Sequence, residues 1–254
     1  MIWVKDSHEI DKMRQSGRLT EALLSFLEKQ ISPGITTLEL DHMAESFINK
    51  NGGRAAFKNY RGFPKSICTS VNSVVVHGIP GKRVLQEGDI ISIDVGICLD
   101  GYYSDAARTF PVGKISAAAE KLIETAKACF YAGLAKTVDG NRIGDISAAV
   151  QAVAEAENYG VVRELVGHGV GRALHEDPDV PNFGTAGRGI RLRKGMTLAI
   201  EPMICAGSHK VEVLDDGWTI QTCDGSLAAH YENTVAITDN EAEILTISPR
   251  KLQR

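Results

Sequence analysis

The chain has 254 residues, of which 43% are hydrophobic and 24% charged, and its 28 basic and 32 acidic side chains give a formal net charge of -4. This composition is typical of a globular protein and gives no basic footprint for nucleic acid or anionic membranes. No apolar run approaches the roughly 18 residues of a membrane span, and the charged start lacks a signal-peptide core. We therefore expect a cytoplasmic protein that recognises neither nucleic acid nor membranes, with a single domain over residues 1–254.

The cysteines are widely spaced and include no CxxC pair, which excludes a disulfide framework and a zinc knuckle. Nothing around Cys98 or Cys205 resembles a base-paired thiolate nucleophile, so both are interpreted as core cysteines. Free thiols are therefore predicted at Cys68, Cys98, Cys129, Cys205 and Cys223.

Two helices are predicted in the first 50 residues. An apolar stripe over 10–31 indicates the first, and the Ser-Pro-Gly that follows ends it. Thr36 and Glu39 form a capping box for the second, over 38–50, which Asn-Gly-Gly terminates.

Segments rich in β-branched residues predict strands between residues 66 and 112 and again from about residue 196. Two helices dense in Ala, Glu and Leu/Ile, about 116–137 and 145–158, separate them. This order of helices, strands, helices and strands predicts an α+β fold. It also suggests, without establishing, two similar halves in one compact body.

The clearest local signal is a β-hairpin. The dipeptide Asp100-Gly101 is a preferred centre for a two-residue type I′ turn. Pairing by equal steps outward from this turn puts Asp105 opposite Gly96. Asp94 lies two residues before Gly96 on the same face, so the two carboxylates become diagonal neighbours.

This placement predicts a metal site. Diagonal Cα atoms are about 7–8 Å apart, so Asp94 and Asp105 can converge on two ions about 3.5–4 Å apart, and Gly96 is expected to leave room for them. Asp94 also stands in the apolar run IISIDVGI, where an ionised carboxylate needs a partner or a shifted pKa. The alternative is that Asp94 bonds to backbone and Asp105 is solvated, and a β-bulge would break the register.

The second half of the chain supplies matching ligand types. His168 lies in GHGVG, a stretch so poor in side chains that we expect the imidazole on exposed, tightly turning backbone. Glu201 ends a strand-like TLAIE before a proline, and period-two alternation puts Glu232 on the face of His230 and Thr234. Each alone is a weak signal, but carboxylates with one imidazole form an oxygen-rich site that suits Mn²⁺, Fe²⁺ or Co²⁺.

Two more histidines are candidates. His77 follows a β-branched run at a turn rich in Gly and Pro, where a catalytic and a buried structural role are equally compatible with the pattern. His175 lies in LHEDPDVP, seven residues after His168.

Taken together, these motifs resemble the type I methionine aminopeptidases over about Lys5 to Ile247, in the bacterial-type minimal form without an N-terminal extension. Six separated motifs in the same order carry the resemblance: HGIP at His77, IDVG with Asp94, YSDAART with Asp105, GHGVGRALHEDP with His168 and His175, IEPM with Glu201, and YENTVAIT with Glu232.

The resemblance implies the pita-bread fold, in which two pseudo-symmetric α+β halves enclose a dinuclear metal site. It implies two divalent cations per chain, cobalt, manganese, iron or similar, with Asp105 and Glu232 bridging them. The implied metal ligands are Asp94, Asp105, His168, Glu201 and Glu232.

The same resemblance assigns His77 and His175 to the substrate backbone and the tetrahedral intermediate, and Glu201 to proton shuttling as well as ligation. It places Tyr60, Phe63, Cys68 and Trp218 around the methionine side chain. Phe57 departs from the cysteine frequent in bacterial relatives and Leu174 replaces an aromatic residue, which leaves the pocket's preference open.

The implied reaction is metal-dependent removal of the N-terminal methionine from nascent proteins and peptides when the second residue is small. Two cations lower the pKa of a water for hydroxide attack on the first peptide bond. The expected partner is the N-terminal Met of nascent polypeptides, transient ribosome association stays open, and a monomer is expected.

Three alternatives remain. An Xaa-Pro aminopeptidase or prolidase has the same ligand types, but usually an additional N-terminal domain. A non-catalytic peptide-binding module on this fold would typically lack metal ligands, all of which are present here. A structural α+β protein would bind no stoichiometric metal and tolerate Asp94→Ala.

Overall fold

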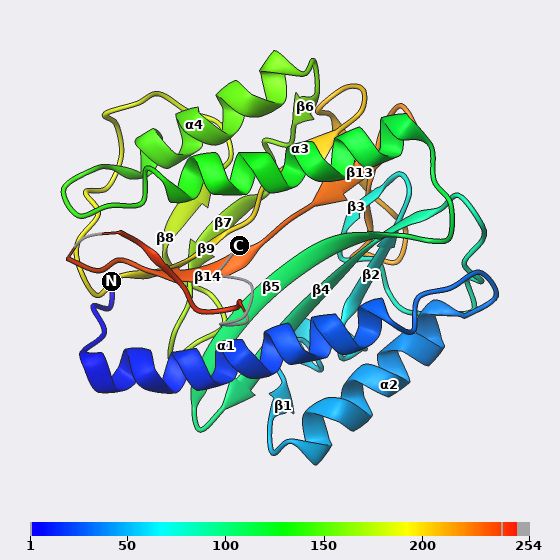
Figure 1. The fold of residues 1–254 in the computed structure, drawn as a ribbon, viewed down its shortest axis with the longest axis horizontal. Helices are drawn as coiled ribbons and strands as arrows, with labels where there is room; N and C mark the ends of the chain where they lie inside the picture. Colours follow the sequence, from blue (N-terminus) through cyan, green and yellow to red (C-terminus); the bar gives the residue numbers. More distant parts are fainter. Residues whose placement is uncertain (1, 240, 248–254) are drawn as a thin grey trace.

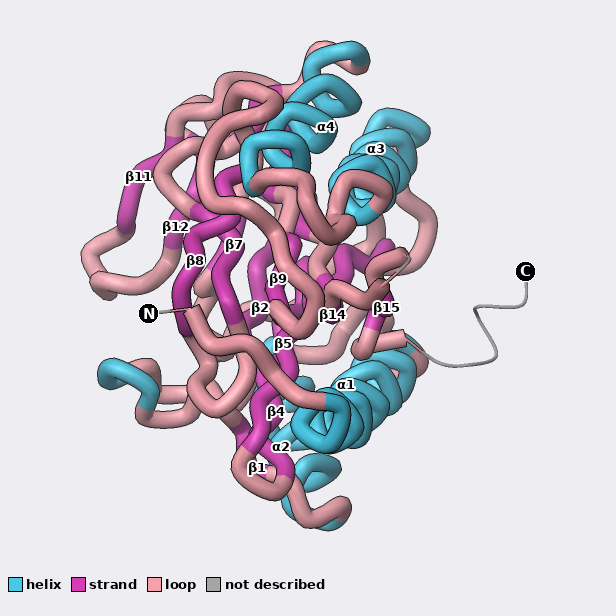
Figure 2. The backbone as a smooth tube through the Cα atoms, turned by 90° about the vertical axis from the view of Figure 1, so that its left-hand side faces the viewer, coloured by secondary structure: helices cyan, strands magenta, loops and turns pink. Residues whose placement is uncertain are grey.

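The computed structural model describes residues 2–239 and 241–247. Its helices and strands alternate along the chain as helices, strands, helices, strands. Two pairs of helices lie on opposite sides of a central layer of strands (Figure 1), and the same layering is visible from the side (Figure 2). The predicted α+β class is confirmed.

The first helical pair consists of α1 (Ser7–Glu28) and α2 (Thr37–Lys50). The predicted capping box of α2 is present, because the Thr36 side chain accepts the backbone N–H of Glu39 while the Glu39 carboxylate accepts that of Thr36. α1 ends earlier than predicted and has a capping box of its own that begins at Asp6. Both helices thus satisfy N-terminal backbone donors that would otherwise be unpaired.

These helices cover the first sheet, in which β4 pairs with its three neighbours. The central pair is the predicted hairpin, and its register sets Gly96 opposite Asp105 without a bulge. Leucine and isoleucine side chains from α1, α2 and β4 form one buried apolar cluster beneath it. The strands are β1 (Arg54–Ala55), β2 (Cys68–Val71), β4 (Ile90–Leu99) and β5 (Tyr102–Pro111).

The second half repeats this arrangement with α3 (Ala117–Leu134) and α4 (Ile143–Ala156). A five-stranded sheet has the order β15-β14-β9-β7-β8. A second large apolar cluster fills the space between these helices and the strands. The strands are β7 (Val166–Gly169), β8 (Glu176–Pro181), β9 (Thr197–Ile200), β14 (Asn233–Ala236) and β15 (Glu243–Ile244).

Two small sheets complete the fold, with the orders β13-β10-β6 and β11-β12-β3. The second joins the halves, since β3 from the first pairs with β12 from the second. None of the helices in the described residues has the length and hydrophobicity needed to cross a bilayer. The strands are β3 (Val74–Val76), β6 (Gly160–Val161), β10 (Met203–Cys205), β11 (Val211–Val213), β12 (Ile220–Thr222) and β13 (Ala228–His230).

Candidate metal centre

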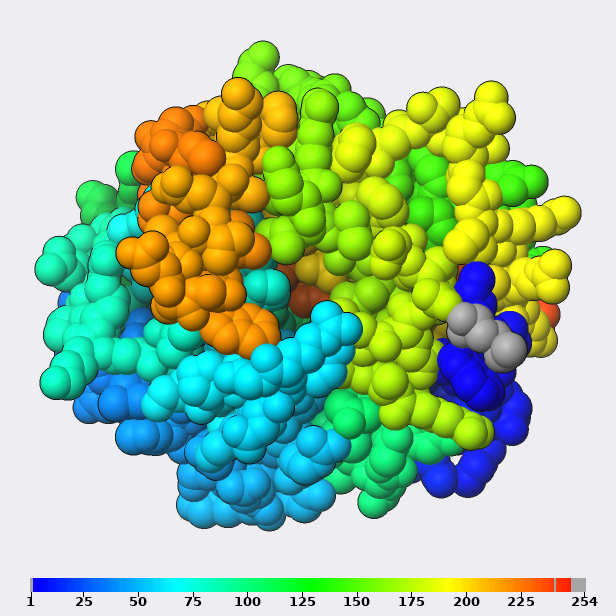
Figure 3. Space-filling view, turned by 180° about the vertical axis from the view of Figure 1, so that it is seen from behind, coloured from blue at the N-terminus to red at the C-terminus, as the bar shows by residue number. Residues whose placement is uncertain are grey.

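A cavity of about 280 Å³ lies between the halves. Viewed from behind, the molecule is hollowed near its centre between cyan, orange and yellow-green segments of the chain (Figure 3). The structure brings all five predicted metal ligands to the wall of this cavity: Asp94, Asp105, His168, Glu201 and Glu232.

The donor atoms form two groups that share one residue. Asp105, His168 and Glu232 each offer an atom within 4.8 Å of the others, and Asp94, His230 and Glu232 form a second such group. The His168 Nε2 atom lies 3.9 Å from Asp105 Oδ2 and 3.6 Å from Glu201 Oε1. The carboxylates and imidazoles therefore face a common space.

The carboxylates are buried without enough partners. Asp94 Oδ1, Asp105 Oδ1 and Glu232 Oε1 have no hydrogen-bond partner. Burial raises the pKa of Asp94 to about 7 and, together with the neighbouring Asp94 charge, raises the pKa values of Asp105 and Glu201 well above the usual range. Burial and the Asp105 charge do the same to the pKa of Glu232. Unpaired buried carboxylates are costly, and a divalent cation is the partner that this oxygen-rich group fits.

His168 is not where the sequence pattern puts it. It lies on β7, a paired strand, and is buried, so the expectation of an exposed turning backbone was wrong. The neighbouring glycines serve close packing instead, since a Cβ on Gly167 or Gly169 would meet a backbone carbonyl oxygen within 2.4 Å. The His168 Nδ1–H donates to the Gly169 carbonyl at 2.8 Å, and burial lowers the His168 pKa to about 4. A neutral ring therefore presents an unprotonated Nε2 to the carboxylates.

The prediction that Gly96 leaves room for metal ions was also wrong. A Cβ at Gly96 would lie 2.6 Å from Cε1 of Phe57 and 3.0 Å from Cβ of Ala56. The aromatic ring fills the space above the glycine, and Phe57 lines the cavity. Leu174 packs in the same apolar cluster as Phe57 but is absent from the described cavity wall.

Backbone contacts across the two halves fix the carboxylates. The Thr234 hydroxyl accepts the N–H of Asp105 at 2.9 Å and donates to the Asp105 carbonyl at 2.9 Å. The N–H of Glu232 donates to the Ala107 carbonyl at 2.9 Å. Arg108 donates to the Glu232 carbonyl and to Asn233 Oδ1. The carboxylates of the first and second halves are therefore held at a fixed separation.

The other predicted site residues form the remaining walls. The Tyr60 ring stacks on His175 with centroids 5.2 Å apart, and Phe63 makes an edge contact with Trp218 at 5.2 Å. Cys68 pairs with Asp94 across β2 and β4, and burial raises its thiol pKa well above the usual value. Its protonated thiol therefore serves as an apolar wall rather than as a nucleophile. All five cysteines are free, as predicted.

His77 has a left-handed backbone, with φ of 58°. Such a conformation is unfavourable for a residue with a side chain and persists where the surroundings impose it. The next residue must be glycine, because a Cβ on Gly78 would lie 2.2 Å from the Thr69 carbonyl oxygen. Burial lowers the pKa of His77, and partial desolvation in the cavity together with the neighbouring His168 and Arg61 lowers that of His175 to about 3, so both rings are neutral at pH 7 and available as hydrogen-bond donors.

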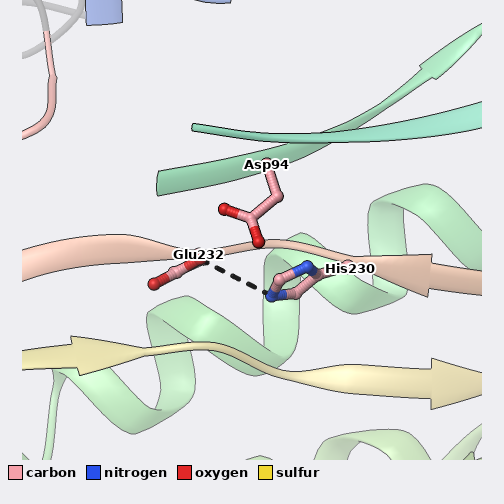
Figure 4. Close-up of side chains that lie close together, drawn as sticks. All are labelled: Asp94, His230 and Glu232. Atoms are coloured by element: carbon pink, nitrogen blue, oxygen red, sulfur yellow. Dashed lines mark ion pairs between the residues drawn. The ribbon is translucent and has the colours of Figure 1, made fainter. Parts of the chain in front are cut away.

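One residue near the metal centre was not predicted. His230 was noted only for sharing a face with Glu232, yet its Nε2 lies 3.7 Å from Glu232 Oε2 and 3.8 Å from Glu201 Oε2. The two-residue spacing from a candidate ligand was the signal available in the sequence. Figure 4 shows the ring beside Asp94 and Glu232.

The fold and the buried carboxylate–imidazole site define a metal-dependent hydrolase. The sequence matches metallopeptidase family M24 over residues 11–239, and the chain belongs to that family. A prolidase from Pyrococcus furiosus superposes with a TM-score of 0.78 over 97% of this chain and 66% of its own, at 21% identity. That likeness shows the shared pita-bread fold alone.

Within the family, full-length relatives are methionine aminopeptidases. One from Clostridium perfringens is 55% identical over 97% of this chain and 99% of its own length, and methionine aminopeptidase 1 of Bacillus subtilis is 51% identical over 97% and 99%. A crystal structure of the Rickettsia prowazekii methionine aminopeptidase has a TM-score of 0.96 at 40% identity, covering 97% of this chain and 100% of that one. The chain is thus a bacterial-type methionine aminopeptidase, a metallopeptidase that removes N-terminal methionine from proteins.

Proposed function

We propose that the cavity holds two divalent cations and that methionine is released only when the second residue is small. The observation that supports the two-ion site most strongly is that Glu232 belongs to both donor groups. The Asp105 side chain lies beside His168, and the Asp105 N–H donates to Thr234, two residues after Glu232. In this proposal Asp105 and Glu232 would hold both ions, and Asp94, His168 and Glu201 would complete the ligand set.

The bound cations supply Lewis-acid polarisation of the scissile carbonyl and lower the pKa of water. Glu201 accepts a proton from the attacking water at its carboxylate and passes it to the leaving amine. His175 donates an N–H to the carbonyl oxygen as negative charge develops there, and His77 donates to the substrate backbone. The neutral state of both rings at pH 7 supports these donor roles.

The apolar end of the cavity is proposed to hold the methionine side chain. The aromatic edge contact between Phe63 and Trp218 and the protonated thiol of Cys68 provide a soft, largely apolar wall. Such a wall fits a polarisable thioether, which makes favourable contacts with aromatic rings. Tyr60 is held against His175 at the edge of the pocket, where the peptide bond is expected to lie.

Substrates and setting complete the proposal. The substrates are the N-termini of nascent polypeptides in the cytoplasm, and a monomer acts on them; transient association with the ribosome is compatible with this role. Residues 1–254 act as a single catalytic domain, of which residues 1, 240 and 248–254 lie outside the described part of the chain. Cobalt, manganese and iron are all compatible with this donor set.

The test is methionine release from Met-Ala-Ser and Met-Lys-Ser by metal-stripped protein, with Mn²⁺, Fe²⁺ or Co²⁺ added back. We expect no release without metal, and release from Met-Ala-Ser alone with metal. Activity saturating at one bound ion would contradict the two-ion site, and equal cleavage of both peptides would contradict the small-residue rule. A peptide series with proline first or second, run beside these, separates this specificity from that of a proline peptidase.

A further inference from the structure

The site contains a buried histidine that the ligand set above leaves unused. His230 is 1% exposed at the end of β13, and neither ring nitrogen has a hydrogen-bond partner. Its backbone, in contrast, is fully paired with Thr109, whose hydroxyl accepts the His230 N–H and donates to the His230 carbonyl, both at 2.9 Å. The hydrogen bonds therefore hold the backbone of His230 in place, while its ring nitrogens have no hydrogen-bond partner.

A buried imidazole without a partner is costly, since almost all buried polar groups in folded proteins are satisfied. His230 is absent from the described cavity wall, so it lies behind the surface that substrate reaches. The groups that face its Nε2 are the carboxylates of Glu201 and Glu232, at 3.8 and 3.7 Å. These distances exceed a normal hydrogen bond.

The distances from His230 Nε2 to the two carboxylates fit donors that bind one shared cation. Imidazole nitrogens bind transition metals at about 2.0–2.1 Å and carboxylate oxygens at about 2.0–2.2 Å, so two donors on one ion lie up to roughly 4.2 Å apart. Asp94, His230 and Glu232 all offer atoms within 4.8 Å of one another. In Figure 4 the Asp94 carboxylate points toward the space beside the His230 ring and Glu232. The three side chains thus converge from the two halves of the protein.

We propose that His230 Nε2 is a sixth protein ligand, which binds the ion held by Asp94 and Glu232. Each ion then has one imidazole: His168 on the ion beside Asp105 and His230 on the other. The inference deepens the proposed function and rests on its two-ion site. Because imidazole favours transition metals over Mg²⁺ or Ca²⁺, His230 gives the Asp94 side a selectivity that carboxylates alone do not provide.

The test measures how many Co²⁺ ions the protein binds and how many imidazole ligands each bound cobalt has. Metal-stripped protein is titrated with Co²⁺ by calorimetry, and X-ray absorption of the fully loaded protein measures the average number of imidazoles per cobalt. His230→Gln removes the proposed ligand and His168→Gln the other imidazole. His42→Gln is the matched control, because His42 is exposed on α2, outside the site.

We expect two ions and one imidazole per cobalt in the wild type and in His42→Gln. In His230→Gln one of the two binding steps weakens by at least about 10-fold, since even indirect contacts to a metal ligand are worth 10–100-fold. When both sites of that variant are filled at high Co²⁺, the average falls to half an imidazole per cobalt. His230→Asn, with circular dichroism to verify folding, provides a second variant if glutamine disturbs the packing.

Two results overturn the inference and are distinguishable. If the wild type binds two ions with only half an imidazole per cobalt, and His230→Gln binds both ions unchanged, His230 is not a ligand and the two-ion site survives. If the wild type binds fewer than two Co²⁺ ions, the proposed two-ion site fails together with this assignment.

Discussion

The two halves of the protein build the same site in different ways. In the first half, one regular hairpin carries both Asp94 and Asp105, so a single local pairing fixes the two carboxylates. In the second half, His168, Glu201 and Glu232 come from β7, from the end of β9 and from the break between β13 and β14. Local geometry positions the first pair of proposed ligands, whereas tertiary packing positions the other three.

The two halves are nevertheless hydrogen-bonded to each other at the proposed ligands. Asp105 is held by Thr234 of the second half, and Glu232 is hydrogen-bonded to Ala107 of the first. The two halves therefore differ in how the chain positions the proposed ligands. We expect both halves to contribute equally to the chemistry.

The largest effect is expected from neutralising one proposed metal ligand from each half. Asp105→Asn and Glu232→Gln should each lower kcat/KM by roughly 10³-fold or more, because one electrostatic stabiliser alone is typically worth 10²–10³-fold. The matched control is Asp100→Asn at the exposed turn of the same hairpin, where Asn also tolerates the positive φ of 49°. Steady-state kinetics at limiting metal checks this, and a strong loss in only one of the two ligand variants would break the symmetry of the account.

The next effect compares the two cavity histidines. His77→Asn keeps a residue that tolerates the left-handed backbone, and it should lower kcat/KM by roughly 10²-fold while leaving metal stoichiometry unchanged. His175→Asn should behave similarly. Calorimetric metal titration is the second readout, and loss of bound metal in His77→Asn would reassign that residue from substrate binding to ligation.

A smaller effect concerns the ion pair that ties the N-terminal arm to the second half. Lys5 and Glu176 are buried together, and Glu176 also accepts the N–H groups of Arg172 and Ala173, next to His175. Lys5→Met leaves the buried Glu176 carboxylate without its cationic partner, so the free energy of unfolding should fall by about 3 kcal/mol. Urea unfolding of this variant, with the exposed Lys29→Met as control, checks it, and equal stability of the two variants would be contrary to the prediction.

The smallest effect is a pH dependence of the metal-free protein. Burial raises the pKa of Asp94 to about 7 and raises the pKa values of Asp105, Glu201 and Glu232 well above the usual range, so as pH rises through about 7 the native state still holds more protons than the unfolded state and stability falls. Below pH 6.5, lowered pKa values of buried histidines such as His168 act in the opposite direction.

Between about pH 6.5 and about pH 8, we expect the Tm of the stripped protein to fall by on the order of 3 °C. Bound metal stabilises the ionised carboxylates, so the loaded protein should show a smaller decrease. Thermal melts with and without Mn²⁺ measure both curves. A metal-free Tm that rises over this interval would mean that the carboxylates are not the dominant buried charges.

The sequence was informative where structure is local. The turn dipeptide Asp100-Gly101 and equal steps outward were enough to predict the pairing of Gly96 with Asp105. The sequence could not predict that Phe57 fills the space above Gly96, because that contact depends on the packing of a separate loop.

The second half shows the same limit more strongly. Its ligand residues became a convincing set only through the family resemblance, and the GHGVG pattern gave the wrong surroundings for His168. A glycine-rich pattern occurs both where neighbouring backbone packs closely and where the chain makes an exposed turn. The sequence alone does not distinguish these two roles. His230 was not among the predicted site residues, because its two-residue spacing from Glu232 was the only signal and a single histidine on a buried strand is usually structural.

The most direct test of the central claim is an anomalous-difference map from crystals of Mn²⁺-loaded protein. We expect two peaks that share Glu232, one beside Asp105 and His168 and the other beside Asp94 and His230. A single peak, or peaks away from the contact between the two halves, would contradict a metal centre built jointly by both.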